Sequence, residues 1–296
     1  IDVFNETMTR CVLDDPRTAR AYALMSKWTE EDHLFPNSAD RQSFATQAAG
    51  WGGGPGQLFA NGNFAMLFSG RYQLMQLRQF EKPLQLAVVE PPHGGFPCNN
   101  LFSGQATVYR GSRHLDLATL FLAFYASEDY SMQIARDGDG LPPIPKFTQT
   151  EEYLRPPAHT NEWGCHEVFA ENAIHEGIPP SFSPFVQYGV VMQCEWTVSG
   201  AVGAGRLTPE EGARQVAERI NRQIALSLAD NPALRKRHDE ACAIQIRIDA
   251  CRRESRPVPA AWVSNPYHRR VYEMNGWFEG AALPPSAQQS GEDSGP

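Results

Sequence analysis

The chain has 296 residues and a formal net charge of −8, with 42% hydrophobic and 20% charged residues. This length allows one large or two modest globular domains with well-buried apolar cores. The acidic balance argues against a general nucleic-acid-binding protein, because such proteins need a basic face to neutralise phosphate. No stretch of about 18 apolar residues indicates a membrane-spanning helix, so small molecules and other proteins are the expected partners.

The chain opens without an initiator Met and without the basic and apolar regions of a signal peptide, which fits either a mature protein or a fragment with a portion before Ile1. Pro16 and apolar residues at helical spacing predict a helix over residues 17–31 that ends near His33. Five glycines and a proline between residues 50 and 56 predict an irregular loop. A short helix, a turn, a buried strand and a second helix are predicted next, over residues 57–60, 61–62, 64–68 and 72–80.

The middle of the chain alternates between apolar runs of strand length and helical patterns. Residues 84–89 and 105–109 are predicted strands. The residues from Asp137 to Gly140 resemble half of a calcium loop, but a turn that ends a helix explains them better. Helices are predicted over residues 115–125, 127–135, 150–154 and 162–174, with the first two packed together.

The clearest helix signal in the chain covers residues 208–228. Thr208 is a good N-cap, Pro209 suits the first helical position, and the two glutamates that follow favour the positive end of the helix. One apolar face is then formed by Val216, Ile220, Ile224 and Leu228. Further helices are predicted over residues 185–202 and 234–253.

No motif in the chain predicts a catalytic, metal or cofactor site. The six cysteines are scattered without a CxxC pair, which favours buried thiols over a zinc site or a disulfide framework. His166-Glu167 lacks the second histidine that a zinc-binding helix needs, so we expect a surface histidine. Paired carboxylates such as Glu210-Glu211 lie at helix starts, where the helix dipole explains them. We therefore expect a protein that is not an enzyme and needs no cofactor.

Aromatic residues near loops and helix starts favour carbohydrate binding, because flat apolar rings stack on the C–H faces of sugars. The candidates are Tyr72, Phe182, Phe185 and Tyr188. Planar polar groups such as Arg71 and Gln105 suit the sugar hydroxyls. Packing in a core is the alternative role for these aromatics, and both roles stay open for Tyr72.

The order of several short motifs resembles that of the family 1 extracellular solute-binding proteins, the maltose-binding-protein-like proteins that deliver sugars to ABC importers. The segment from Phe59 to Tyr72, FANGNFAMLFSGRY, is similar to the signature of this family. The later matches are Pro91-Pro92, Ser103-Gly104, Gly140-Leu141-Pro142, Pro179-Pro180 and the helix start at Thr208. The resemblance covers about residues 14–228, with Ser103 where a glycine is usual and Tyr72 where tryptophan is common.

The resemblance implies an α/β protein of the two-lobed, type II periplasmic-binding-protein-like class, with the N-terminal part of the first lobe missing. Residues 1–103 would lie mainly in the second lobe, and residues 104–138 would cross into the first. Residues 139–230 would return to the second lobe and form its C-terminal helices. A helical extension, residues 231–280, and a disordered tail, residues 281–296, would follow.

The implied function is reversible binding of a sugar or oligosaccharide between the lobes, as a monomer that docks on the permease subunits of an ABC importer. The implied location is periplasmic or extracellular, with a lipoprotein anchor upstream of this chain. A carbohydrate-active enzyme and a sugar-sensing module on the same scaffold remain alternatives. The expected substrate-binding residues are Gly70, Arg71, Tyr72, Ser103, Gly104, Gln105, Phe182, Phe185 and Tyr188.

Overall fold

The structure is a computed structural model that describes residues 2–37, 39–40, 43, 53–102, 104 and 106–281. The chain forms two compact units. Unit 1 comprises Ile1–Ser38 and Pro179–Pro296, and unit 2 comprises Ala39–Ile178. This division keeps residues 104–138 in the same unit as their neighbours on both sides. The predicted disordered tail lies outside the described residues except for Ala281.

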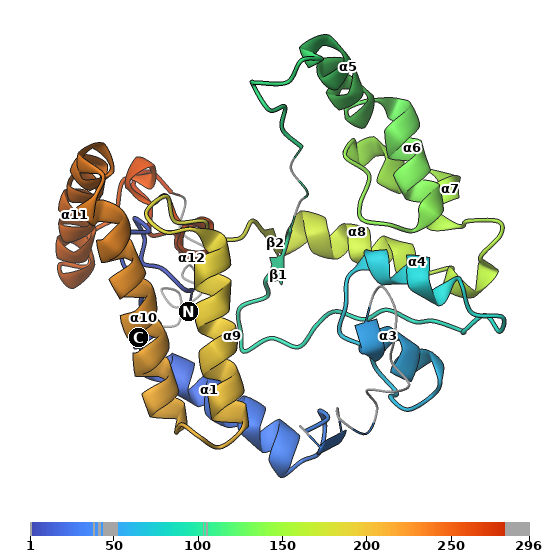
Figure 1. Ribbon diagram of the computed structural model, residues 1–296, viewed down its shortest axis with the longest axis horizontal. Helices are drawn as coiled ribbons and strands as arrows, with labels where there is room; N and C mark the ends of the chain where they lie inside the picture. The colour runs from blue at the N-terminus through green and yellow to red at the C-terminus, as the bar shows by residue number, and fades with distance from the viewer. Residues whose placement is uncertain are drawn as a thin grey trace, which may run out of the picture. The chain divides into compact units, whose positions relative to one another are not determined.

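Unit 1 is helical, and α1, α9 and α10 pack on one another (Figure 1). Its elements are α1 (Pro16–Glu30), α9 (Tyr188–Gly203), α10 (Pro209–Ala229), α11 (Pro232–Arg253), the 3₁₀ helix η4 (Ala260–Trp262) and α12 (Pro266–Met274). All the helices predicted for these segments are present, with shifts of a few residues at their ends. The extension predicted after residue 230 is thus helical, as α11 and α12.

Helix α10 begins where its sequence signals predicted. The Thr208 side chain accepts a hydrogen bond from Glu211 N at 3.2 Å, and the Glu211 carboxylate accepts one from Thr208 N at 2.9 Å. This reciprocal capping box satisfies two amides that have no partner inside the helix. The predicted apolar face of α10 is buried in the main core of unit 1, where Phe4, Phe185, Val191 and Val198 also lie.

The C-terminal extension binds the N-terminal segment of the chain through Glu6. Tyr272 Oη donates to Glu6 Oε1 at 3.0 Å, and Gln245 Nε2 donates to Glu6 Oε2 at 2.9 Å. Arg252 Nη1 lies 2.8 Å from Glu6 Oε1. The carboxylate is almost fully buried, so these partners replace the water that it loses on folding.

Asn265, at the start of α12, binds the backbone of the same N-terminal segment. The fully buried side-chain amide of Asn265 donates to Phe4 O at 3.1 Å and Asn5 O at 3.2 Å. The backbone N–H of Asn265 donates to Glu6 O at 2.9 Å. The extension is therefore an integral part of unit 1, which joins both ends of the chain.

Unit 2 is built from short elements. In order, these are α3 (Gly53–Ala60), η1 (Arg71–Gln73), α4 (Leu74–Leu77), β1 (Asn99–Asn100), α5 (Leu115–Tyr125), α6 (Glu128–Asp137), η2 (Pro145–Gln149), α7 (Glu151–Leu154), η3 (Thr160–Glu162), α8 (Cys165–His175) and β2 (Gly177–Ile178). Strands β1 and β2 pair in parallel, with Asn99 opposite Gly177. The apolar core of unit 2 is small, and it centres on Ala135, Tyr153 and Ala170.

Two predictions for unit 2 are wrong. The glycine-rich stretch is not irregular throughout, because α3 begins at Gly53, while residues 50–52 lie outside the described residues. Gly56 allows this helix to approach Gln73 and Gln76, since a Cβ at Gly56 would overlap both side chains. The strands predicted over residues 64–68, 84–89 and 105–109 are irregular chain without strand pairing in the described part, which excludes residue 105.

These segments and α5 leave apolar side chains exposed. Met66 and Phe68 are 84% and 80% exposed, although the prediction was a buried strand. Helix α5 is almost wholly apolar and has no buried residue. Its exposed large side chains are Leu115, Leu117, Leu120, Phe121 and Phe124. A monomeric protein rarely leaves a contiguous apolar surface of this kind uncovered.

Helices long and apolar enough to cross a membrane do not occur in the described parts of the chain.

Replacing Glu6 tests how strongly the extension stabilises unit 1. Glu6→Ala should lower the free energy of unfolding by roughly 2–4 kcal/mol, because it leaves the buried Tyr272 hydroxyl without its acceptor and removes the ion pair. Glu218→Ala is the matched control, since Glu218 and its partner Arg214 are both exposed. Urea denaturation measures both variants, and equal losses would contradict a special role for Glu6.

Candidate functional site

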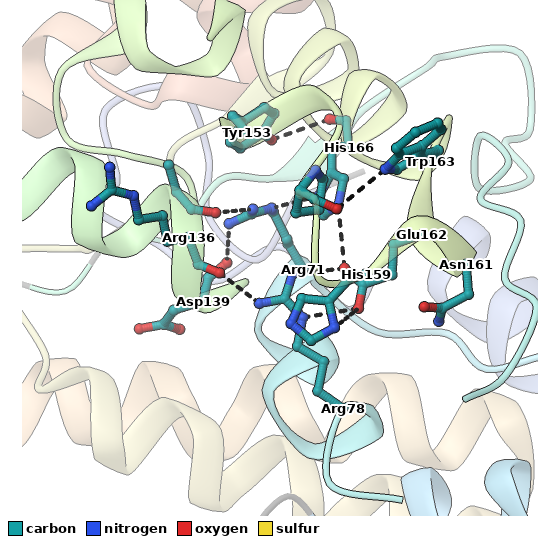
Figure 2. Close-up of polar contacts among 12 residues, drawn as sticks. Arg71, Arg78, Arg136, Asp139, Tyr153, His159, Asn161, Glu162, Trp163 and His166 are labelled. Carbon is teal, nitrogen blue, oxygen red and sulfur yellow. Dashed lines mark hydrogen bonds and ion pairs between the residues drawn. The ribbon is translucent and has the colours of Figure 1, made fainter. Parts of the chain in front are cut away.

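Arg71 binds the C-terminal end of α6, where helix carbonyls have no amide partner within the helix. Its Nη2 donates to Ala135 O at 2.8 Å, and its Nη1 donates to Ile134 O at 3.3 Å. Nη1 also reaches the carbonyls of Asp139 and Gly140, at 2.9 and 2.8 Å, beyond the helix end (Figure 2). A cation at this position satisfies the free carbonyls and complements the negative end of the helix dipole.

Arg78, just after α4, binds the same helix end. Its Nη1 donates to Arg136 O at 2.7 Å. Its Nε and Nη2 donate to the two carboxylate oxygens of Glu162, at 2.9 and 2.7 Å. This two-pronged geometry is the strongest form of an arginine–carboxylate pair. Glu162 therefore neutralises the guanidinium of Arg78, whose side chain is only 10% exposed.

His166 lies between the two arginines. Arg71 Nε donates to His166 Nδ1 at 3.2 Å, so Nδ1 is the acceptor and the ring proton is on Nε2. Nε2 lies 3.2 Å from Glu162 Oε2. The Arg71 guanidinium also lies over the Tyr153 ring, 4.3 Å from its centre, in a cation–π contact. We call Arg71, Arg78, Glu162, His166 and Tyr153 the arginine network.

The turn after α6 is shaped to accept this network. Gly138 has a φ of +74°, a left-handed conformation that favours glycine. A Cβ at Gly138 would lie 2.7 Å from Arg78 Cζ, so a side chain there would displace the guanidinium. The predicted helix-ending turn over Asp137–Gly140 is thus confirmed. Gly138 adopts the left-handed conformation that the turn needs, and it leaves room for the Arg78 guanidinium.

The pKa values of the network follow from burial and from its contacts. Burial alone would raise the pKa of Glu162, but hydrogen bonds from Arg78 and His166 outweigh burial and hold the pKa at about 2. Burial lowers the pKa of the Arg71 guanidinium and raises the pKa of Tyr153 to about 12. Burial and the nearby Arg78 both lower the pKa of His159, at the edge of the network. Glu162 is therefore a carboxylate at neutral pH and is not a free general acid.

The position of Arg71 changes its interpretation. We expected its guanidinium to offer hydrogen bonds to a sugar, but the side chain is only 4% exposed and every guanidinium nitrogen donates inside the protein. The neighbouring Tyr72 is 48% exposed and could contact a ligand. Gly70, the third residue of the expected group, lies against the Tyr72 ring.

The three expected aromatics of unit 1 differ in exposure. Phe182 and Tyr188 are 43% and 37% exposed, and their rings lie edge to face with centroids 4.8 Å apart. Phe185 is only 3% exposed and belongs to the main core, where its ring lies 4.9 Å from that of His238. Burial removes Phe185 from the set of residues that could stack on a ligand, whereas Phe182 and Tyr188 keep that option.

The expected hinge segment is only partly described. Gly104 is exposed, and a Cβ there would meet no other atom within 4 Å. Ser103 and Gln105 lie outside the described residues. Among the residues that the structure describes, no three His, Cys, Asp or Glu side chains are grouped so that they could hold a metal ion.

Sequence reasoning missed most of the arginine network. His166 was expected on the surface but is fully buried. Glu162 and His166 are four residues apart, which is the spacing of neighbours on a helix, although Glu162 ends η3 and His166 is the second residue of α8. Arg71 in η1, Arg78 after α4 and the carbonyls at the end of α6 are far away in the sequence, so no local pattern could identify them as partners.

The network predicts an acid-labile unit 2. Glu162 has a folded-state pKa of about 2, below its ordinary value of 4.5. A depressed carboxylate pKa stabilises the fold above the unfolded-state value, and this contribution is lost as the pH falls through the folded-state value. The free energy of unfolding should therefore fall by about 3 kcal/mol between about pH 5 and pH 2 on account of this group.

Glu162→Gln isolates that contribution. Chemical denaturation monitored across this pH range should show a gap between the original protein and the variant that closes as the pH falls. Glu128→Gln, which changes an exposed partner of Lys146, should show no such gap. A gap for Glu162→Gln that stays constant with pH would contradict the assignment.

Comparisons with protein-family models and with curated proteins found no match to this chain. Among solved structures, it is similar to an ABC substrate-binding protein from Listeria monocytogenes in complex with cycloalternan. The TM-score is 0.54 at 18% identity, and the match covers 75% of this chain and 53% of that chain. The chain thus spans about half the length of this neighbour. At this level of identity the likeness concerns the fold alone.

Proposed function

We propose that this chain is part of a solute-binding protein that binds a sugar or oligosaccharide reversibly and delivers it to an ABC importer. The observation that carries the proposal is the similarity of its fold to a substrate-binding protein whose structure contains cycloalternan. The aromatic side chains Tyr72, Phe182 and Tyr188 support it, because each presents a partly exposed ring of the kind that stacks on sugars. Binding would be non-covalent, without catalysis.

The proposed architecture is the two-lobed type II arrangement, to which this chain contributes only a part. Two observations support this. The matched neighbour is about twice as long as the region that this chain covers, since only 53% of it is spanned. In addition, α5 and residues 64–68 and 84–89 carry apolar side chains that need a further layer to cover them.

The proposed ligand contact in unit 2 is Tyr72, and Phe182 with Tyr188 form a separate proposed contact pair in unit 1. Residues 103–105 are proposed as a hinge segment whose polar groups bind hydroxyls. Arg71 and Phe185 are no longer among the proposed contacts, because both side chains are buried. Closure of two lobes on a sugar would derive its free energy from tighter binding in the closed state.

The proposed partners are the permease subunits of an ABC importer, and the proposed location is periplasmic or extracellular with a lipoprotein anchor. The protein is also proposed to act as a monomer. This part of the proposal rests on the fold similarity and on the order of motifs in the sequence.

Replacing Tyr72 tests the sugar site. Tyr72→Ala should weaken the binding of cycloalternan or maltotetraose by at least roughly tenfold, about 1.4 kcal/mol, because it removes the stacking surface. Isothermal titration calorimetry on the protein as its gene encodes it measures the affinity. Tyr109→Ala is the matched control, since Tyr109 is a more exposed tyrosine of the same unit. Equal affinities for Tyr72→Ala and the original protein would remove Tyr72 from the site.

Hydrogen exchange tests whether a further layer covers α5. The amides of α5 should exchange more slowly in the protein as its gene encodes it than in a chain limited to residues 1–296, because a covering layer suppresses local opening. Helix α10, whose apolar face is already buried in unit 1, should exchange equally in both. Equal exchange of α5 in the two proteins would contradict the two-lobed arrangement.

A further inference from the structure

We infer that Gly70 and Arg71 are positioning residues that together set the orientation in which the Tyr72 ring is presented. This inference rests on the proposed function in one respect only, which is the expectation that a changed ring orientation weakens sugar binding. The orientation itself is a property of the protein without ligand. Neither residue would touch the sugar, and the two act on Tyr72 through different contacts.

Gly70 acts through the space that it leaves. A Cβ at position 70 would lie 2.9 Å from Cε1 and 3.0 Å from Cδ1 of the Tyr72 ring. Carbon atoms in van der Waals contact lie about 3.5–4.0 Å apart, so the ring could not keep its place beside a larger residue. The backbone of Gly70 is extended, with a φ of −94°, so alanine is compatible with its conformation. The requirement for glycine here thus comes from the ring and not from the backbone.

Arg71 acts through the backbone. Its guanidinium makes five hydrogen bonds, four to carbonyls at the end of α6 and one to His166. An arginine with this many partners has few alternative rotamers, so its Cα is fixed relative to α6 and α8. Tyr72 is the next residue in the 3₁₀ helix η1, and its side chain leaves the backbone in a fixed direction as a result. The buried network is therefore connected to the exposed ring by one peptide unit.

The two residues differ in what their loss should do to stability. Arg71→Lys keeps the charge but cannot form the planar fork of hydrogen bonds, so it should destabilise unit 2 as well as release Tyr72. Gly70→Ala affects only the mobile end of an exposed side chain, so the ring should rotate away at little cost to folding. Gly70→Ala thus isolates the positioning effect, and it remains informative if Arg71→Lys fails to fold.

Fluorine NMR of protein labelled with 3-fluorotyrosine measures the ring environment without any sugar. The Tyr72 resonance is the one that disappears in Tyr72→Phe. We expect Gly70→Ala to shift this resonance, leave the thermal midpoint unchanged and weaken the binding of cycloalternan by roughly tenfold, which is about 1.4 kcal/mol. Gly94→Ala is the matched control, because a Cβ at this exposed glycine of the same unit would meet nothing within 4 Å.

An unchanged Tyr72 resonance in Gly70→Ala would overturn the inference, and so would an equal shift in Gly94→Ala. A shifted resonance together with unchanged cycloalternan affinity would also overturn it, because the orientation would then have no effect on binding. If the resonance shifts but the original protein binds no cycloalternan, the positioning of Tyr72 is supported while the sugar site of the proposed function fails. The two failures are therefore distinguishable.

Discussion

The burial of two guanidinium groups at the end of α6 is the constraint on which unit 2 depends. A charge removed from water is costly unless hydrogen bonds and an opposite charge replace its hydration. Arg71 meets this requirement with helix carbonyls and His166, and Arg78 meets it with Arg136 O and both oxygens of Glu162. Because the apolar core of unit 2 is small, these polar contacts determine which of its short elements lie together.

The same constraint determines which side chains remain available to a ligand. Arg71 directly precedes Tyr72 in the chain. The network uses every guanidinium nitrogen of Arg71, whereas the Tyr72 ring stays about half exposed. An arginine beside an aromatic residue in a binding motif is easily assigned to the ligand. Here the arginine stabilises the protein, and the aromatic ring is the group that could contact a sugar.

Most local signals in the sequence were reliable, apart from the glycine-rich stretch in which α3 begins, whereas signals that depend on distant partners were not. The N-terminal cap of α10, the turn that ends α6 and the apolar face of α10 depend only on residues within a few positions, and all were predicted correctly. Strand pairing requires an edge supplied from elsewhere, and the runs over residues 64–68 and 84–89 find none in the described part of the chain. The burial of His166 and Phe185 likewise depends on elements far away in the sequence.

The two units bury their apolar side chains to different extents. Unit 1 encloses a large apolar core and joins both ends of the chain through Glu6 and Asn265, so its stability is largely self-contained. Unit 2 has few buried apolar side chains, while α5 alone exposes five large ones. Apolar surface of this extent contributes to stability only when it is removed from water. A further α/β layer over α5 would supply that burial and would also give residues 64–68 and 84–89 strands to pair with.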